Sequence, residues 1–337
     1  MLALLYLALA SAIGAELCAT MLPSLTGAAE ANERRPIASW VIAGPAAFLI
    51  GNLLMTWATY LVAWAFRASA SSMAYANAIV MTVVALALIA RVMRRHKLRQ
   101  PLTINTDWRW MDIAVAVIGL AIGTAIMFHT ARMEGSTLVL GRTAFGDLNI
   151  HLGMARSFSE GRNFPTGYIA YAGTDIRYHF MFYFLVGNLE FLGLRLDWAL
   201  NLPSILSFAS ALLLLYALGA VIGRDRRVGA IAVLFFLLRS SPAFFFYVAR
   251  LHGVAEFFGT RTFIGLTPNE SFGIWTLNTY VVERHFGFAL GLVFIAVLYL
   301  ARGTIHQPTG VLANDGAAAN EHAERAPRTP EPQNGGF

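Results

Sequence analysis

The sequence predicts an all-α fold, a polytopic transmembrane helical bundle of about seven or eight membrane segments with a helical loop on its outer face. Three observations predict this class. Of 337 residues, 57% are hydrophobic and only 13% are charged, whereas soluble domains carry about 25% charged residues. Several apolar stretches reach the roughly 20 residues that a helix needs to cross about 30 Å of hydrocarbon. The charged residues gather between these stretches.

The apolar stretches divide the chain into a membrane domain and a tail. The expected segments cover residues 2–22, 37–66, 72–92, 111–129, 180–194, 198–222, 228–248 and 286–300. Residues 1–302 are therefore predicted to form a transmembrane domain, with a catalytic-type outer loop at 131–178. Residues 303–337 are rich in Ala, Pro, Glu, Asn and Gly and are expected to form a disordered polar tail.

Basic residues predict how the chain is oriented. The basic cluster at residues 91–99 is expected in the cytoplasm, which places the loop at 131–178 on the outer face. The segment at 180–194 is short for a span and contains Glu190, a costly residue in lipid. If this segment is re-entrant or interfacial, the arginines at 224–227 also face the cytoplasm; if it spans, they break the rule. We favour the first arrangement.

Several classes of site are excluded by composition. Cys18 is the only cysteine, so neither an intramolecular disulfide nor a cysteine metal site can form. The net charge of +6 lies between membrane segments, where it sets topology and meets anionic headgroups, so no nucleic-acid partner is expected. No Gly-rich turn joins a strand to a helix, which excludes a Rossmann or P-loop nucleotide site.

The outer loop is expected to contain a short surface helix. Residues 148–158 mix apolar and polar side chains at helical spacing, and Leu148, Leu152 and Ala155 share one face. Such a pattern suits a helix that lies along the membrane surface.

Asp147, at the start of this helix, has two interpretations. It caps the helix, which contributes about 1 kcal/mol, or it acts as a general base at the rim of a membrane cavity. His151 follows one turn later, and an Asp-His pair can also hold a divalent cation. Two ligands are too few to assign a metal site.

Other polar residues of the outer loops are candidates for binding a substrate. Tyrosines near residue 178 are interpreted as an interfacial belt or as ring faces for a sugar, and Arg177 as a headgroup contact or a phosphate ligand. A later polar group includes Glu283, and Arg284 beside it is either a snorkelling anchor or a contact for a lipid phosphate. The candidate donor-binding residues are His151, Asp175, Arg177, Tyr178, His179, Arg284 and His285.

Three stretches of the chain carry a resemblance to a known group of membrane enzymes. They are FGDLNIHLGMARSFSEGRNFP, RYHFMFYFLVGNLEFLGLRLDWALNLPSILSF and LNTYVVERHFGFALGL, between about residues 130 and 300. In these stretches the chain resembles the GT-C superfamily of membrane glycosyltransferases, which use lipid-phosphate-linked sugars. Members of that superfamily usually place the key Asp after the first helix and continue through more helices. The chain is therefore expected to be a short or truncated member.

The resemblance implies a multi-helix fold, an outer-face active site and a polyprenyl-phosphate sugar donor. It also implies inverting transfer with Asp147 as the catalytic base, and His151 as a neighbour that orients Asp147 or helps to bind a metal. Some members need a divalent ion and others need none. A divalent cation, Mg²⁺ or Mn²⁺, thus stays an open alternative, and no metal ligand is assigned.

The function expected from the sequence is transfer of a sugar from the lipid-linked donor to an envelope glycan, lipid or protein. The Ala- and Arg-rich composition suggests a bacterial cytoplasmic membrane. Two alternatives stay open: a non-catalytic membrane subunit of a glycan-assembly complex, and a transporter or flippase. Polar residues gather in the outer loops rather than at mid-depth, which favours surface chemistry over transport.

Overall fold

A computed structural model describes residues 1–22, 37–97, 109–141, 145–238, 248–259 and 279–305 of the chain. The chain divides into two units, Met1–Tyr299 and Leu300–Phe337. Of the second unit, the structure describes only residues 300–305, the end of a helix, so the predicted disorder of residues 306–337 lies outside the described residues. All that follows concerns the first unit.

The chain is a membrane protein built mainly of helices. Five helices are long and apolar enough to cross a membrane: α1 (Leu2–Met21), α3 (Trp40–Ala65), α4 (Ser72–Lys97), α5 (Trp110–Thr130) and α8 (Leu196–Ile222). Other apolar helices are α7 (Met181–Phe191), α9 (Arg226–Leu237) and α12 (His285–Ile305), and α11 (Val254–Gly259) is a single short turn. The predicted total of seven or eight membrane segments stays a prediction, since residues 239–247, which follow α9, lie outside the described part.

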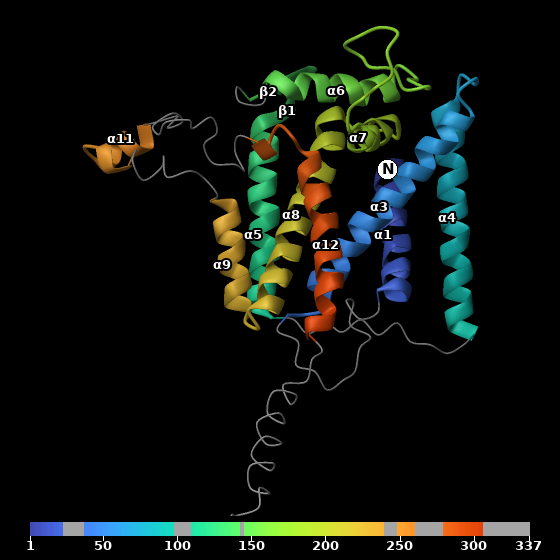
Figure 1. The fold of residues 1–337 in the computed structure, drawn as a ribbon. Coiled ribbons are helices and arrows are strands. Elements are labelled where there is room, and N and C mark those ends of the chain that lie inside the picture. Colours follow the sequence, from blue (N-terminus) through green and yellow to red (C-terminus); the bar gives the residue numbers. More distant parts are fainter. Residues whose placement is uncertain (23–36, 98–108, 142–144, 239–247, 260–278, 306–337) are drawn as a thin grey trace, which may run out of the picture. The chain divides into compact units, whose positions relative to one another are not determined.

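α7 is too short to span the membrane. Its 11 residues rise only about 16 Å, roughly half the hydrocarbon thickness. Its residues from Phe182 to Leu189 are buried, so it packs inside the protein near α6. This agrees with a re-entrant segment at 180–194. As a result, the turn between α8 and α9 and the C-terminal end of α4 both lie at the end of the bundle opposite α6 (Figure 1).

Small residues allow α1 and α3 to cross closely. Ala10 and Gly14 of α1 face Ala47 and Gly51 of α3, each pair spaced four residues apart. A Cβ atom on Gly51 would lie 1.8 Å from the Ala10 carbonyl oxygen, and one on Gly14 would lie 2.0 Å from that of Ala47. Without a hydrophobic drive between helices in lipid, this close approach supplies the packing that holds them together.

Buried polar side chains join other helices. The amides of Asn77 in α4 and Asn188 in α7 exchange two hydrogen bonds of 2.7 and 3.1 Å. The carboxylate of Asp112 in α5 accepts hydrogen bonds from the Ala38 backbone N–H at 2.9 Å and from the Tyr216 hydroxyl at 2.6 Å. The side chains of Asn77, Asn188, Asp112 and Tyr216 therefore have the partners that a membrane interior requires.

A hairpin and a surface helix cover one end of the bundle. Strands β1 (Ala131–Glu134) and β2 (Thr137–Leu140) pair antiparallel around Gly135, whose φ of +63° suits a tight hairpin turn. The sequence had indicated only a polar loop here. α6 (Phe145–Ser159) then lies across the ends of the membrane helices (Figure 1). Its predicted apolar face is confirmed, since Leu148, Leu152 and Ala155 are buried.

Candidate functional site

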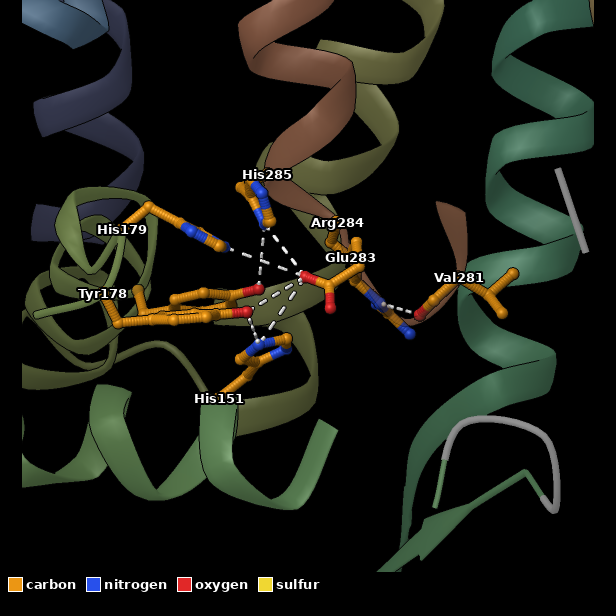
Figure 2. A network of polar contacts seen from close by, with 8 residues as sticks. His151, Tyr178, His179, Val281, Glu283, Arg284 and His285 are labelled. Carbon is orange, nitrogen blue, oxygen red and sulfur yellow. Dashed lines mark hydrogen bonds and ion pairs between the residues drawn. The ribbon is translucent and has the colours of Figure 1, made fainter. Parts of the chain in front are cut away.

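Five polar residues from three separate chain segments converge beneath α6, and we call them the Glu283 cluster. His151 comes from α6, Tyr178 and His179 from the loop before α7, and Glu283 and His285 from the start of α12. Figure 2 shows the other four side chains directed toward the Glu283 carboxylate. The sequence had placed four of these five among the donor-binding candidates, and the structure brings these four together.

The contacts of the cluster converge on one oxygen, Glu283 Oε2. It lies 3.4 Å from His285 Nδ1, 3.7 Å from His151 Nε2 and 3.8 Å from His179 Nε2. The Tyr178 hydroxyl donates to it at 3.4 Å and also lies 3.0 Å from His151 Nε2. Among the described residues, the only ion-pair partners of Glu283 are therefore histidines.

His151 is a polar residue on the apolar face of α6. Its side chain is only 2% exposed and stacks on the Tyr183 ring, with centroids 4.3 Å apart. Burial lowers the pKa of His151 to about 4, so the imidazole is neutral at pH 7. The close approach of α6 to α7 needs Gly187, because a Cβ atom there would lie 2.2 Å from the Ala155 carbonyl oxygen.

Burial also shifts the other titrating groups of the cluster. It lowers the pKa of His179 and raises the pKa of Tyr178 to about 12, with the Glu283 charge adding to the second effect. The pKa of Glu283 is raised by burial and by the charge of Asp147, while the Tyr178 hydrogen bond opposes this. The cluster thus holds neutral imidazoles around a carboxylate whose charged form is disfavoured.

Asp147 lies beside the cluster and is exposed. It is the third residue of α6, within the first turn rather than before it. Its charge raises the pKa of Glu283, His151 and Tyr178, and no hydrogen bond or ion pair joins it to another described residue. An exposed carboxylate at the rim of a buried polar cluster is free to meet a substrate hydroxyl.

Arg284 points away from the cluster (Figure 2). Its guanidinium is fully buried and donates to the Val281 carbonyl at 3.1 Å, to Thr130 Oγ1 at 2.9 Å, and to Asn201 Oδ1. A further contact of 3.4 Å reaches the Met127 carbonyl at the C-terminal end of α5, where the helix dipole favours a cation. Burial lowers its pKa to about 10, so it stays charged at pH 7. The predicted contact of Arg284 with a lipid phosphate stays a prediction. A phosphate would have to displace these internal hydrogen bonds to reach the guanidinium.

Asp175 and Arg177 are exposed in the loop before α7. Within the described residues, no hydrogen bond or ion pair joins their side chains to the Glu283 cluster. Asp175 forms an isolated backbone bridge with Gly167, which closes the loop on itself. Their role in binding a donor stays a prediction that the cluster geometry does not support.

A mostly apolar cavity of about 410 Å³ has Tyr178, His179 and His285 of the cluster in its wall. The Oδ1 atom of Asn52 in its wall is buried and has no hydrogen-bond partner in the described part of the chain. The lining residues come from α3, the loop before α7, α7 and α12: Asn52, Leu53, Thr56, Trp57, Tyr178, His179, Phe180, Met181, Phe182, Leu185, His285, Phe288, Ala289 and Leu292. The cavity thus joins an apolar wall to a polar end.

A second cavity, of about 450 Å³, lies against α6, the hairpin and the start of α8. Arg156, Glu190 and Arg195 line it. Glu190, whose charge had suggested a non-spanning segment, accepts a 2.7 Å hydrogen bond from Ser159 and lies 3.5 Å from Arg156 Nε. The Glu190 carboxylate is therefore paired with side chains of α6, Ser159 and Arg156, as a charged group at membrane depth requires.

Sequence reasoning missed the central role of Glu283 and the stacking of Tyr183. Glu283 was visible as a polar residue immediately before Arg284 and His285, but nothing local distinguished it from its neighbours. Tyr183 is part of an apolar run and carries no local signal. One ligand atom from each of His151, His179 and Glu283 lies within 4.8 Å of the other two, an arrangement that can hold a metal ion.

Comparisons of the chain with protein-family models, with curated proteins and with solved structures find no match.

Proposed function

We propose that the protein is a membrane glycosyltransferase of the GT-C type, acting on the outer face of a bacterial cytoplasmic membrane. It takes a sugar from a polyprenyl-phosphate donor and transfers it to an envelope acceptor, with inversion. The observation that carries the proposal is the cavity that runs from an apolar wall to the Glu283 cluster. A lipid-linked sugar likewise has an apolar prenyl chain at one end and a polar sugar phosphate at the other.

In this proposal the prenyl chain occupies the apolar wall formed by α3, α7 and α12. The phosphate then meets the polar end, where His179 and His285 line the cavity. Neutral imidazoles and a tyrosine hydroxyl can donate hydrogen bonds to a phosphate, and the protein does not have to bury a charged donor to do so. The sugar carbon lies at the outer rim, where the acceptor approaches from water.

Asp147 is the general base. As the bond between the sugar and the phosphate oxygen breaks, the acceptor oxygen bonds to the sugar carbon and its proton passes to the Asp147 carboxylate. The phosphate leaves as polyprenyl phosphate with the bonding electrons. An exposed aspartate needs no raised pKa for this role, only hydrogen-bonding reach of the acceptor hydroxyl.

The first test is mass spectrometry of envelope glycolipids and glycans from four strains: a deletion, and the deletion carrying wild type, Asp147→Asn or Glu160→Gln. Loss of a sugar on deletion, restored by wild type and Glu160→Gln but not by Asp147→Asn, supports the proposal. Glu160 is the matched control because it is an exposed carboxylate just after α6. Restoration by Asp147→Asn would remove the catalytic role and favour a non-catalytic subunit.

A second test concerns the cavity. Leu53 lines it, whereas Leu54, its neighbour on α3, does not and is 48% exposed. Leu53→Trp should fill the cavity and reduce transfer about tenfold or more, while Leu54→Trp should leave transfer close to wild type. Equal activity of the two variants would argue against the cavity as the donor site.

A further inference from the structure

We propose that His151, His179 and Glu283 form a binding site for a divalent metal ion of the zinc class, with one coordination position left open. The inference goes beyond the proposed function and does not depend on it, because a metal ion can be bound and counted without a sugar donor. It also differs from the Asp147–His151 pair that the sequence suggested, since the structure supplies a third ligand and another carboxylate.

The ligand atoms already surround a common space. The Nε2 atoms of His151 and His179 lie 3.7 and 3.8 Å from Glu283 Oε2, and all three ligand atoms lie within 4.8 Å of one another. Around a tetrahedral zinc, with metal–ligand distances of about 2.1 Å, ligand atoms are about 3.4 Å apart. The two shorter distances need to close by only a few tenths of an ångström. His179, which is 48% exposed at the end of a loop, has room to move.

The histidines do not form short hydrogen bonds with Glu283, although the Tyr178 hydroxyl lies 3.0 Å from His151 Nε2. Hydrogen bonds between nitrogen and oxygen are about 2.7–3.2 Å long, whereas the three histidines stand 3.4–3.8 Å from the Glu283 oxygen. The rings thus surround the carboxylate without closing on it (Figure 2). An ion between them would bring the ligands together.

The donor set selects the kind of ion. Two imidazoles and one carboxylate are ligands of zinc and similar transition metals, while Mg²⁺ prefers oxygen ligands in octahedral geometry. The Nε2 atoms of His151 and His179 both face the Glu283 carboxylate, and imidazole nitrogens in the neutral form are metal ligands. The Tyr178 hydroxyl contacts His151 Nε2 and Glu283 Oε2, the atoms that would bind the ion, so metal binding would displace its contact with His151 Nε2.

The local charge also favours a cation. The charge of Asp147 raises the pKa of Glu283. The nearest cation in sequence, Arg284, is turned away and bonded to four internal acceptors. Two neighbouring carboxylates without a Lys or Arg partner among the described residues leave a negative charge that a divalent ion would neutralise.

The test uses the full chain in detergent or nanodiscs, purified without a polyhistidine tag. The protein is stripped with a chelator, equilibrated with Zn²⁺, desalted and measured for zinc by mass spectrometry, with melting temperature as a check of folding. We expect about one zinc per chain, and a loss in His179→Asn and Glu283→Gln larger than the roughly 10- to 100-fold that losing an outer partner costs. Excess Mg²⁺ should not displace the zinc.

His252→Asn is the matched control, since His252 Nδ1 also lies 3.6 Å from a glutamate, Glu256, in an exposed pair away from the Glu283 cluster. Zinc retained in His252→Asn and lost in the two cluster variants supports the site. Zinc absent from wild type, or equally bound by wild type and Glu283→Gln, would overturn it. Zinc content tests this site and sugar transfer tests the proposed function, so the two can fail separately. Asp147→Asn should bind zinc like wild type and transfer no sugar.

Discussion

Glu16 and Glu283 are mostly buried carboxylates at opposite ends of the helical bundle, and their partners differ. Glu16 lies near the C-terminal end of α1, where Arg95 Nη2 is 2.8 Å and Arg91 Nε is 3.5 Å from its carboxylate. Glu283 lies just before α12, and among the described residues it contacts only histidines and a tyrosine hydroxyl. The two ends are seen in Figure 1 as the lower end of α1 and the upper end of α12.

This difference in partners indicates that the Glu16 charge is structural, whereas the Glu283 charge is available to a ligand. Two guanidinium groups from α4 satisfy Glu16, so its carboxylate links two membrane helices and needs nothing further. Glu283 accepts one long hydrogen bond from the Tyr178 hydroxyl and otherwise lies among histidines at 3.4–3.8 Å, so no Lys or Arg among the described residues neutralises its charge. A charge inside a membrane helix, as Glu16 is in α1, is also a feature of transporters. Its pairing with arginines supports a structural role instead.

The largest effect should come from Arg284, the cation next to Glu283 that bonds elsewhere. Arg284→Met leaves buried acceptors on Asn201 and Thr130 without their donor, so we expect a loss of about 3 kcal/mol in unfolding free energy. Arg132→Met, in an exposed pair with Glu134, should cost less than about 1 kcal/mol. Thermal unfolding in detergent measures both. Similar costs would mean that Arg284 does not hold the start of α12 against α5 and α8.

Gly187→Ala should disturb the surroundings of Glu283 and leave those of Glu16 unchanged. Its Cβ would lie 2.2 Å from the Ala155 carbonyl oxygen, so α6 must shift and carry His151 away from Glu283. We expect about 1–3 kcal/mol of destabilisation and weaker zinc binding. Gly44→Ala is the control, because a Cβ there meets no atom within 4 Å. Unchanged zinc binding in Gly187→Ala would show that the α6–α7 contact does not position His151.

Acid should destabilise the zinc-free protein through His151. Its pKa is about 4 in the fold and about 6.5 when unfolded, so the unfolded chain binds the proton more readily. Its contribution is present above about pH 6.5 and is lost as pH falls toward 4, an effect of order 2–3 kcal/mol. The lowered pKa of His179 acts in the same direction. The raised pKa of Glu283 acts in the opposite one, since its contribution is present at low pH and lost as pH rises.

Melting temperatures from pH 7.5 to 4.5 test this slope. Wild type should lose stability more steeply than His151→Gln, whatever the absolute stability of the variant. Parallel curves would show that His151 does not titrate in this window and that another group controls the acid response.

The smallest effects should come from the two carboxylates themselves. Glu16→Gln should cost up to about 1 kcal/mol, and less in high salt, because its arginine partners are 25–36% exposed. Glu283→Gln in the zinc-free protein should be neutral within about 0.5 kcal/mol or slightly stabilising, since the fold disfavours the charged form. Chemical unfolding of both variants at two salt concentrations measures this. A larger cost for Glu283→Gln than for Glu16→Gln would reverse the comparison.

Much of the fold could be predicted because its signals are local. Apolar length identified the spanning helices, the short segment before residue 194 with Glu190 indicated the non-spanning α7, and the spacing of Leu148, Leu152 and Ala155 indicated α6 and its buried face. The hairpin at 131–140 was missed because two four-residue strands in a polar loop leave little pattern.

The candidate site was predicted in part, as a list of polar residues without their geometry. His151, Tyr178, His179 and His285 were selected because they are polar residues in outer loops, and that criterion selected the exposed Asp175 and Arg177 equally. Sequence position alone could not separate residues whose side chains meet from residues that face water.

By itself, the sequence determined the membrane class, most helix boundaries and the polar stretch at residues 131–178, because hydropathy and helical periodicity act over neighbouring residues. Only the tertiary structure decided that Glu283 is the centre of the cluster and that Arg284, one residue later, is directed into the protein. It also decided that a cavity from α3, α7 and α12 ends at this cluster. These features depend on contacts between residues more than 100 positions apart, such as His151 and Glu283, and no local pattern records which distant side chains a fold brings together.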